Sequence, residues 1–250
     1  MSTVPYHVSA GRAHERLDPS THGQGDLKES FYIKRFKGKQ PQQQLPNALQ
    51  QHKEELADFF ESCRQCSLRV LEGFAMALEL PKEYFAQHHD AEHDRLRLIH
   101  YPPAPVEEHG QESGQIRAGS HSDYGSCTLL FQKDVGGLQV EDSDQKLWLD
   151  VPPVKGCLVC NVGDAMEFWT SGRFKSTYHR VAMPRDKTQA ESRFSMAYFC
   201  QPSEECRLVP LKQGTNPSEV AEILRRKGIP DPGKPLTGGE HLRARLAATY

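Results

Sequence analysis

A histidine and an aspartate stand two residues apart in SHSDYGSCTLLFQ, residues 120–132. Side chains at i and i+2 of a β-strand point to the same face, so His121 and Asp123 can aim an imidazole and a carboxylate at one point. His179 lies in STYHRVAM, which has the character of a later strand. Two histidines and one carboxylate leave three positions of an octahedral metal open, which suits oxygen-activating Fe(II), whereas zinc favours a closed tetrahedral set. We therefore predict an iron site at His121, Asp123 and His179.

An arginine and a serine share the same spacing fourteen residues after His179, in RFSMAYF. Arg193 and Ser195 are expected on one face of a strand flanked by apolar residues. A buried guanidinium is costly unless it meets an anion, and its planar fork fits a carboxylate. A dicarboxylate such as 2-oxoglutarate meets this demand, with one end on iron and the far carboxylate at Arg193. The alternative is an internal salt bridge to one of the 33 acidic residues.

Other histidines and cysteines are less suited to hold a metal. A hydrogen-bonded core or surface role is expected for the histidines of the charged, solvated stretch QHHDAEHDR, which are His88, His89 and His93. One C-x-x-C pair falls on the apolar stripe of a helix, and the other lies in a strand that points its two sulfurs to opposite faces. These pairs are Cys63/Cys66 and Cys157/Cys160. An odd total of seven cysteines argues against a disulfide framework.

The elements that must position these residues change character at Leu96. From there to about residue 202, some seven short apolar runs alternate with Gly, Asp and Pro, with no helix between them. This pattern predicts a mainly β fold with flanking helices, built on an antiparallel barrel or double-sheet jelly roll. Inside it, Leu129, Phe131 and Phe199 are expected as walls facing the metal, although a place in the plain core explains each of them equally well.

The flanking segments complete the expected organisation as one structural unit. Residues 1–94 are expected to hold an irregular arm over 1–30, a loop over 31–46 and a helix over 46–80 that packs on the barrel. Residues 95–202 form the jelly-roll core, which carries both sites. Residues 203–250 are a tail with one or two helices from Pro217 and a Pro/Gly-rich link at 230–239.

The bulk composition sets limits on partners. The 250 residues carry a formal net charge of -2, which gives no electrostatic case for nucleic acid or an acidic membrane surface. The sequence shows neither a run long enough to span a bilayer nor a signal-peptide pattern, so a cytoplasmic location is expected. The expected partner is a small-molecule substrate.

These stretches together resemble the isopenicillin-N-synthase-like branch of the Fe(II)/2-oxoglutarate oxygenases. The resemblance is carried, in order, by LRLIHYPP (96–103), SHSDYGSCTLLFQ (120–132), GGLQV (136–140), NVGDAMEFWTSGRFKSTYHRV (161–181) and RFSMAYF (193–199). GDLKESFYI (25–33) and GGEHLRARLAATY (238–250) also look like the family. The resemblance implies a double-stranded β-helix core and a dioxygenase that uses Fe(II), 2-oxoglutarate and O₂. It implies hydroxylation or desaturation of a small organic molecule, coupled to decarboxylation of 2-oxoglutarate to succinate.

Carried over residue by residue, the resemblance makes His121, Asp123 and His179 the iron ligands and Arg193 and Ser195 the binders of the distal carboxylate. Tyr101, in HYP, matches a tyrosine that often supports the cosubstrate, although Ile99 stands where an asparagine is common. Family members usually carry roughly another eighty residues before the point where this chain starts, so a truncated N-terminal region is expected. Two alternatives stay open: an Fe(II) oxidase of the same fold that does not use 2-oxoglutarate, and an inactive truncated relic that binds metal.

Overall fold

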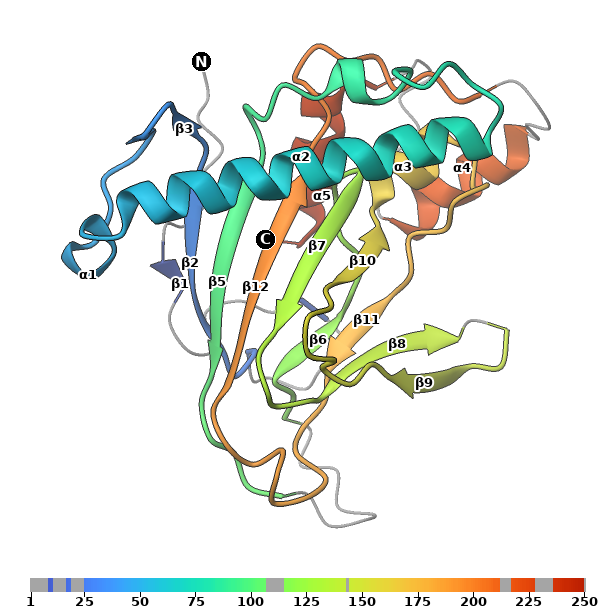
Figure 1. The fold of residues 1–250 in the computed structure, drawn as a ribbon. Coiled ribbons are helices and arrows are strands. Elements are labelled where there is room, and N and C mark those ends of the chain that lie inside the picture. Colours follow the sequence, from blue (N-terminus) through green and yellow to red (C-terminus); the bar gives the residue numbers. More distant parts are fainter. Residues whose placement is uncertain are drawn as a thin grey trace.

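The computed structural model describes residues 9–10, 17–18, 25–106, 115–142, 144–211, 217–227 and 236–249. Two β-sheets, in which all neighbouring strands are antiparallel, form the centre of the molecule (Figure 1). The larger has the order β1 (Ser9–Ala10), β2 (Glu29–Lys34), β5 (Arg95–Tyr101), β12 (Arg193–Cys200), β7 (Cys127–Gln132) and β10 (Val159–Val162). The smaller has the order β6 (Ala118–His121), β11 (His179–Val181), β8 (Leu138–Asp142) and β9 (Leu147–Asp150). The predicted jelly-roll architecture is confirmed.

Side chains along β5 point alternately to the apolar core and to a cavity between the two sheets. Leu96 belongs to the apolar core, and Leu98 packs against it. Arg97, Ile99 and Tyr101 point the other way and line the cavity between the two sheets, together with residues of β6, β8 and β11. Because the side-chain period of a strand is two, the polar inward face and the apolar outward face are fixed by the same register.

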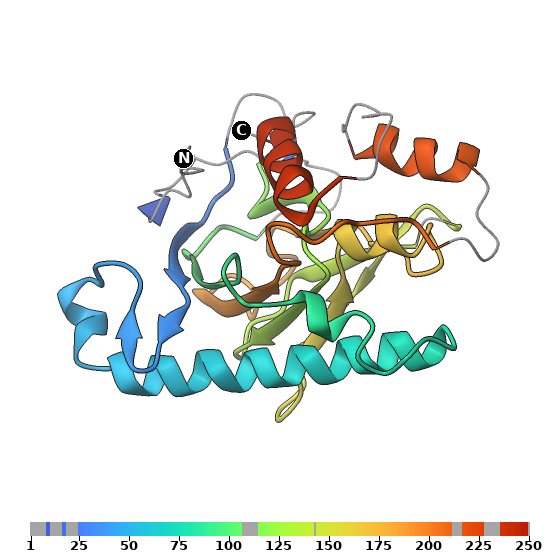
Figure 2. The ribbon, with the colours of Figure 1, turned by 90° about the horizontal axis from the view of Figure 1, so that it is seen from above.

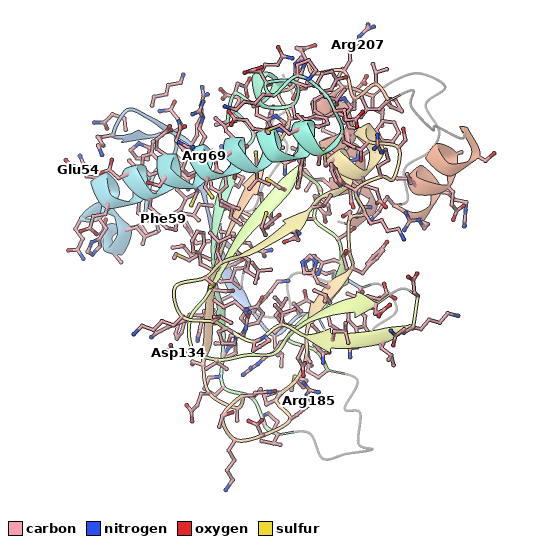
Figure 3. All side chains as sticks on the ribbon, turned by 45° about the vertical axis from the view of Figure 1, so that its right-hand side comes forward. Glu54, Phe59, Arg69, Asp134, Arg185 and Arg207 are labelled. Carbon is pink, nitrogen blue, oxygen red and sulfur yellow. The ribbon has the colours of Figure 1, made fainter. Side chains whose placement is uncertain are left out.

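The core under the larger sheet is closed by α2 (Lys53–Ala77), which lies across the strands (Figure 1). Phe60 is buried against Tyr198 of β12, with 5.0 Å between the ring centroids. Phe59, labelled beneath α2 in Figure 3, contacts Phe131 of β7 at 5.1 Å. The predicted single helix over 46–80 is in fact two, since α1 (Asn47–Gln50) precedes α2, and the helix ends before Glu79, whose φ is 58°.

Two segments differ from the predictions. The expected loop over 31–46 is wrong, because β2 completes the sheet beside β5 and β3 (Phe36–Lys37) pairs with β4 (Gln40–Pro41). The expectation of seven runs with no helix between them is also wrong, because the run CLVCNVGDAMEFW (157–169) divides at Gly163 into β10 and the helix α3 (Asp164–Trp169). All six side chains of α3 are buried, including the charged Asp164 and Glu167, and a run of six residues is too short to show a helical period in the sequence.

The histidine-rich stretch contains a short 3₁₀ helix, η1 (Ala86–His88), and one buried histidine. His89 is not solvated as expected, although the predicted hydrogen-bonded role holds. Its Nδ1 lies 2.8 Å from the Phe85 carbonyl oxygen, and its Nε2 lies 2.8 Å from Ser126 Oγ. A carbonyl can only accept, so Nδ1 carries the proton and the Ser126 hydroxyl donates to Nε2.

The C-terminal part forms α4 (Pro217–Arg226) and α5 (Gly238–Thr249), as predicted. Seen from above, they lie beside α3 on the side of the barrel opposite α2 (Figure 2). Thr237 and Glu240 form a capping box at the start of α5, with a 2.9 Å and a 3.1 Å hydrogen bond. Most of the predicted link at 230–239 lies outside the described residues. Within the described ranges, no helix is long and apolar enough to cross a membrane.

Candidate active site

The three predicted metal ligands meet between the sheets. His121 ends β6, Asp123 follows it, and His179 begins β11, which pairs with β6 so that the two histidines stand directly opposite each other. Their ring centroids are 4.3 Å apart, and one ligand atom from each of the three residues lies within 4.8 Å of the others. Among the described residues, this is the only such group of three or more His, Cys, Asp or Glu side chains.

Backbone carbonyls orient both imidazoles. His121 Nδ1 lies 2.7 Å from the Gly119 carbonyl oxygen, and His179 Nδ1 lies 3.3 Å from that of Thr177. Each Nδ1 therefore carries its proton and donates it, which turns Nε2 into the lone-pair donor, the tautomer that a metal requires. His179 Nε2 lies 3.8 Å from Asp123 Oδ1. The donor set thus fits a divalent metal with two nitrogens and one oxygen on one face.

Two polar residues that the sequence analysis did not single out hold the carboxylate. Asn161 of β10 donates from Nδ2 to Asp123 Oδ2 at 2.7 Å, and the Thr128 side chain of β7 also hydrogen-bonds Asp123. These contacts leave Oδ1 directed at the histidines. Asn161 and Thr128 stand among apolar residues on neighbouring strands, and this isolation within apolar runs was their only signal in the sequence.

The protonation states also suit a metal. Burial lowers the pKa of His121 to about 3, assisted by the nearby His179 and opposed by Asp123. Burial by itself would raise the pKa of Asp123, but the two histidines and the bonds from Asn161 and Thr128 outweigh it and lower the pKa. At neutral pH the site therefore presents a neutral His121 imidazole and an ionised carboxylate, the forms that bind metal.

The predicted arginine and serine lie in the same cavity as the ligands. Arg193 stands opposite Tyr101 of β5, and Ser195 stands opposite Gln132 of β7. The guanidinium lies 4.8 Å from the Tyr101 ring centre, and it donates to Ser195 Oγ at 3.3 Å and to Gln132 Oε1 at 2.9 Å. Arg193 is 1% exposed, and its burial lowers its pKa. In the part of the chain that the structure describes, no carboxylate pairs with it.

Comparison with known proteins now decides the family. The profile of the 2OG-Fe(II) oxygenase superfamily matches residues 92–202. The UPF0676 protein C1494.01 of Schizosaccharomyces pombe is 33% identical over 263 residues, which cover 98% of this chain and 74% of that protein. This chain belongs to the 2OG-Fe(II) oxygenase superfamily. It is an oxidoreductase of the dioxygenase class, and its cofactor and cosubstrates are Fe(II), 2-oxoglutarate and O₂.

Further relatives of this oxygenase have named activities or ligands. The proline hydroxylase buaE of Petromyces alliaceus is 34% identical and covers 78% of this chain. The crystal structure of full-length Neurospora crassa T7H in complex with alpha-KG superposes with a TM-score of 0.78, is 30% identical, and covers 97% of this chain and 73% of that one. T7H has also been crystallised with thymine. The oxygenase chain spans 59% of the hydroxylase's length.

A second buried arginine supports the far end of the oxygenase cavity. Arg117, which is fully buried, donates to the carbonyl oxygens of Gln189 at 2.9 Å, Glu191 at 2.9 Å and Pro102 at 3.2 Å. Burial lowers its pKa, and the charge of Arg193 lowers it further. Glu191 lies two residues before Arg193, so Arg117 fixes the backbone that leads into the β12 strand.

The cavity that holds both sites has a volume of about 80 Å³, and a second one of about 60 Å³ adjoins it. Four residues line both: the ligands His121 and Asp123, together with Arg97 and Phe199. Phe199 lines the cavity at His121 and Asp123, as expected of a wall residue, whereas for Leu129 and Phe131 the alternative of a place in the core holds. Leu129 belongs to the core under α2 and Phe131 packs against that core, while Leu130, between them, lines the cavity. The two alternatives differ by one residue of register.

Proposed function

We propose that His121, Asp123 and His179 hold Fe(II) and that Arg193, with Ser195 and Tyr101, binds the distal carboxylate of 2-oxoglutarate. One observation carries this proposal. A single cavity presents two oriented imidazoles and a carboxylate at one place, and a buried guanidinium with no carboxylate partner among the described residues at another. A dicarboxylate that chelates a metal at one end would satisfy both.

The roles of this chain's own groups follow from their contacts. Gly119 and Thr177 keep the two imidazoles in the ligating tautomer through their carbonyl oxygens. Asn161 prevents Asp123 from rotating, and Arg193 fixes the length and direction of the bound diacid. When bound, Fe(II) with 2-oxoglutarate and O₂ supplies the oxidising power that breaks a substrate C–H bond, while 2-oxoglutarate leaves as succinate and CO₂.

We propose that the substrate is a compact cyclic molecule with a carbonyl or carboxylate oxygen, which approaches the ligands from the side of the smaller cavity. Its walls combine aromatic side chains with guanidinium groups, here Tyr32, Tyr124, Phe199, Arg95 and Arg97. Arg97 lies over the Tyr32 ring at 4.6 Å and donates to Ser30 Oγ at 2.8 Å, so its charge is held in a fixed place beside the ligands. Proline and thymine, associated with two relatives, are both compact rings with such oxygens.

The experiment measures O₂ consumption and succinate release with purified protein, Fe(II) and a panel of cyclic amino acids and pyrimidines. The proposal expects both signals only when 2-oxoglutarate is present, and a rise with the right substrate. O₂ uptake without 2-oxoglutarate would favour the oxidase alternative. Iron binding without either signal across the panel would favour the inactive relic. We propose a cytoplasmic location on the basis of composition alone.

A further inference from the structure

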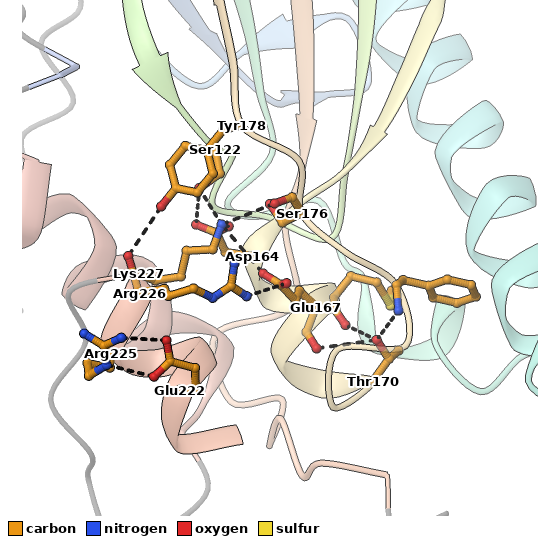
Figure 4. Close-up of polar contacts among 12 residues, drawn as sticks. Ser122, Asp164, Glu167, Thr170, Ser176, Tyr178, Glu222, Arg225, Arg226 and Lys227 are labelled. Carbon is orange, nitrogen blue, oxygen red and sulfur yellow. Dashed lines mark hydrogen bonds and ion pairs between the residues drawn. The ribbon is translucent and has the colours of Figure 1, made fainter. Parts of the chain in front are cut away.

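A cluster of charges, most of them buried, lies beside the residues that flank the proposed iron ligands, and Figure 4 shows its contacts around Asp164, Glu167 and Lys227. Helix α3 contributes Asp164 and Glu167, and the C-terminal part of the chain contributes three cations. Lys227 Nζ lies 2.7 Å from Asp164 Oδ1, and Arg245 Nε lies 2.8 Å from Asp164 Oδ2. Glu167 pairs with Arg226 at 2.9 Å and with Lys227 at 3.6 Å. The Lys227 and Asp164 side chains are 1% and 0% exposed.

Two features of the sequence bring these charges together: a glycine before α3, and cations at the end of α4 and in α5. The backbone enters α3 through Gly163, where a Cβ would come 2.2 Å from the Gly125 carbonyl oxygen, so only glycine lets α3 start against the loop after Asp123. Lys227 directly follows α4, and Arg245 reaches back from α5 to the Lys227 carbonyl oxygen. Charges this deeply buried are costly unless they are paired, so the cluster holds the C-terminal helices against α3.

The cluster also contacts the residues next to all three proposed ligands. Lys227 donates to Ser122 Oγ at 2.8 Å, and Ser122, which separates His121 from Asp123, donates to Asp164 Oδ2 at 3.1 Å. The backbone N–H of Asp164 donates to the carbonyl oxygen of Asp123 at 2.7 Å. The ammonium of Lys227 lies 4.5 Å from the ring centre of Tyr178, which precedes His179.

Arg245 makes the corresponding contact after the second ligand. Its guanidinium lies 4.9 Å from the ring centre of Tyr124, which follows Asp123. The two cations from the C-terminal part thus touch the main chain or side chains around both ligand-bearing segments, 121–123 and 179.

We propose that Lys227 is a positioning residue of the iron site, which sets the spacing between the 121–123 segment and His179 through Ser122, Asp164 and Tyr178. The proposal rests on the proposed function, since it takes these three residues as metal ligands. It makes docking of the C-terminal helices a condition for tight metal binding. A purely structural tie would instead contribute to stability and leave the metal affinity of the folded protein unchanged.

The test compares Mn(II) binding to metal-free protein by titration calorimetry, in the parent and in two matched variants. Lys227→Met removes the buried ammonium but keeps a side chain of similar length. Arg225→Met makes the same kind of change two residues earlier on α4, where an exposed ion pair with Glu222 is lost. We expect Lys227→Met to weaken Mn(II) binding by about ten-fold to a hundred-fold, as removal of supporting contacts around metal ligands does. Arg225→Met should bind Mn(II) like the parent.

Ser122→Ala covers the case in which Lys227→Met does not fold. It removes the oxygen through which Lys227 reaches the ligand segment and leaves the Lys227–Asp164 ion pair in place, so the fold should survive. We expect weaker Mn(II) binding with little change in melting temperature. Mn(II) binding equal to the parent's in Ser122→Ala, or in a folded Lys227→Met, would overturn the positioning role.

One further variant separates this proposal from the proposed function. His121→Ala should lose Mn(II) binding if the site is the one proposed. If His121→Ala bound Mn(II) like the parent, the ligand assignment itself would fail. If His121→Ala lost binding while Lys227→Met and Ser122→Ala kept it, only the positioning role would fail.

Discussion

Replacing Arg193 by lysine tests the cosubstrate site most directly, because the change keeps the charge and removes the fork. Two terminal N–H groups of Arg193 donate hydrogen bonds, one to Ser195 Oγ at 3.3 Å and one to Gln132 Oε1 at 2.9 Å. Its guanidinium plane is further held beside the Tyr101 ring. Both polar partners are neutral, so a carboxylate can replace them and gain two parallel hydrogen bonds.

The size of the effect follows from the number of bonds that lysine can keep. An ammonium at this position retains the charge and one hydrogen bond to the carboxylate, and it loses the second. A hydrogen bond to a charged group contributes about 1.5–3 kcal/mol. The expected loss in 2-oxoglutarate affinity is therefore about ten-fold to about 150-fold.

The affinity is measured by calorimetric titration of 2-oxoglutarate into the Mn(II)-loaded protein, which does not turn over. Arg185→Lys is the matched control, since Arg185 forms an exposed ion pair with Asp150 near the barrel rim. It should bind 2-oxoglutarate like the parent, and Arg193→Lys should bind Mn(II) like the parent. Unchanged 2-oxoglutarate affinity in Arg193→Lys would refute the assignment and favour the oxidase alternative.

Three further changes test other parts of the site. Asp123→Ala should abolish Mn(II) binding and succinate release while the melting temperature stays near the parent's, because a buried carboxylate is removed rather than created. Arg117→Met leaves three backbone carbonyls without their donor, of which only that of Pro102 is in a fully buried contact, so it should cost about 1–3 kcal/mol in denaturant unfolding and raise the 2-oxoglutarate KM. Burial lowers the pKa of His89 to about 4, so as pH falls below its ordinary 6.5 the unfolded chain takes up the proton first and stability is lost down to about pH 4. Between about pH 6.5 and pH 4, His89→Asn should make the plot of unfolding free energy against pH shallower by up to about 1.4 kcal/mol per pH unit. An unchanged slope would contradict the lowered pKa of buried His89.

That His121 and Asp123 point to one place could be predicted because their geometry is local. His121 and Asp123 share a strand face by period-two geometry alone, and the three-residue set has few uses other than a metal. Their meeting with His179 was not local, since it depends on the pairing of β6 with β11 across more than fifty residues. Sequence pattern supplies the strands but not the register between distant ones.

There is a physical reason why the sequence could not tell whether Leu129 and Phe131 face the metal or the core. Strand β7 is buried on both faces, by the core under α2 on one side and by the cavity on the other. A strand buried on both faces loses the polar–apolar alternation that tells inside from outside. Thr128 marks the inward face, because it hydrogen-bonds Asp123, but a threonine in a strand is too common to be read that way.

Arg117 was missed for a different reason. Its partners are the backbone carbonyls of Pro102, Gln189 and Glu191, and every residue carries a carbonyl. No pattern in the side chains could show that two distant segments converge on one guanidinium. The charged cluster around Asp164 has the same character, since Lys227 lies sixty-three positions later in the chain and reaches Asp164 only through the fold.

The two ends of the cavity carry opposite charges, a carboxylate at the proposed metal ligands and a guanidinium at the far end. At the ligands, Asp123 is held ionised with its partners around it, and a divalent metal would neutralise it. At the far end, Arg193 is buried with only neutral partners among the described residues. Each end is costly without its ligand, and one bound diacid on a metal relieves both. Metal and 2-oxoglutarate should therefore bind cooperatively, because the metal's charge supplies the attraction for the near carboxylate while Arg193 supplies it for the far one. Calorimetry should find 2-oxoglutarate affinity sharply lower without Mn(II), and equal affinity would show that Arg193 alone determines binding.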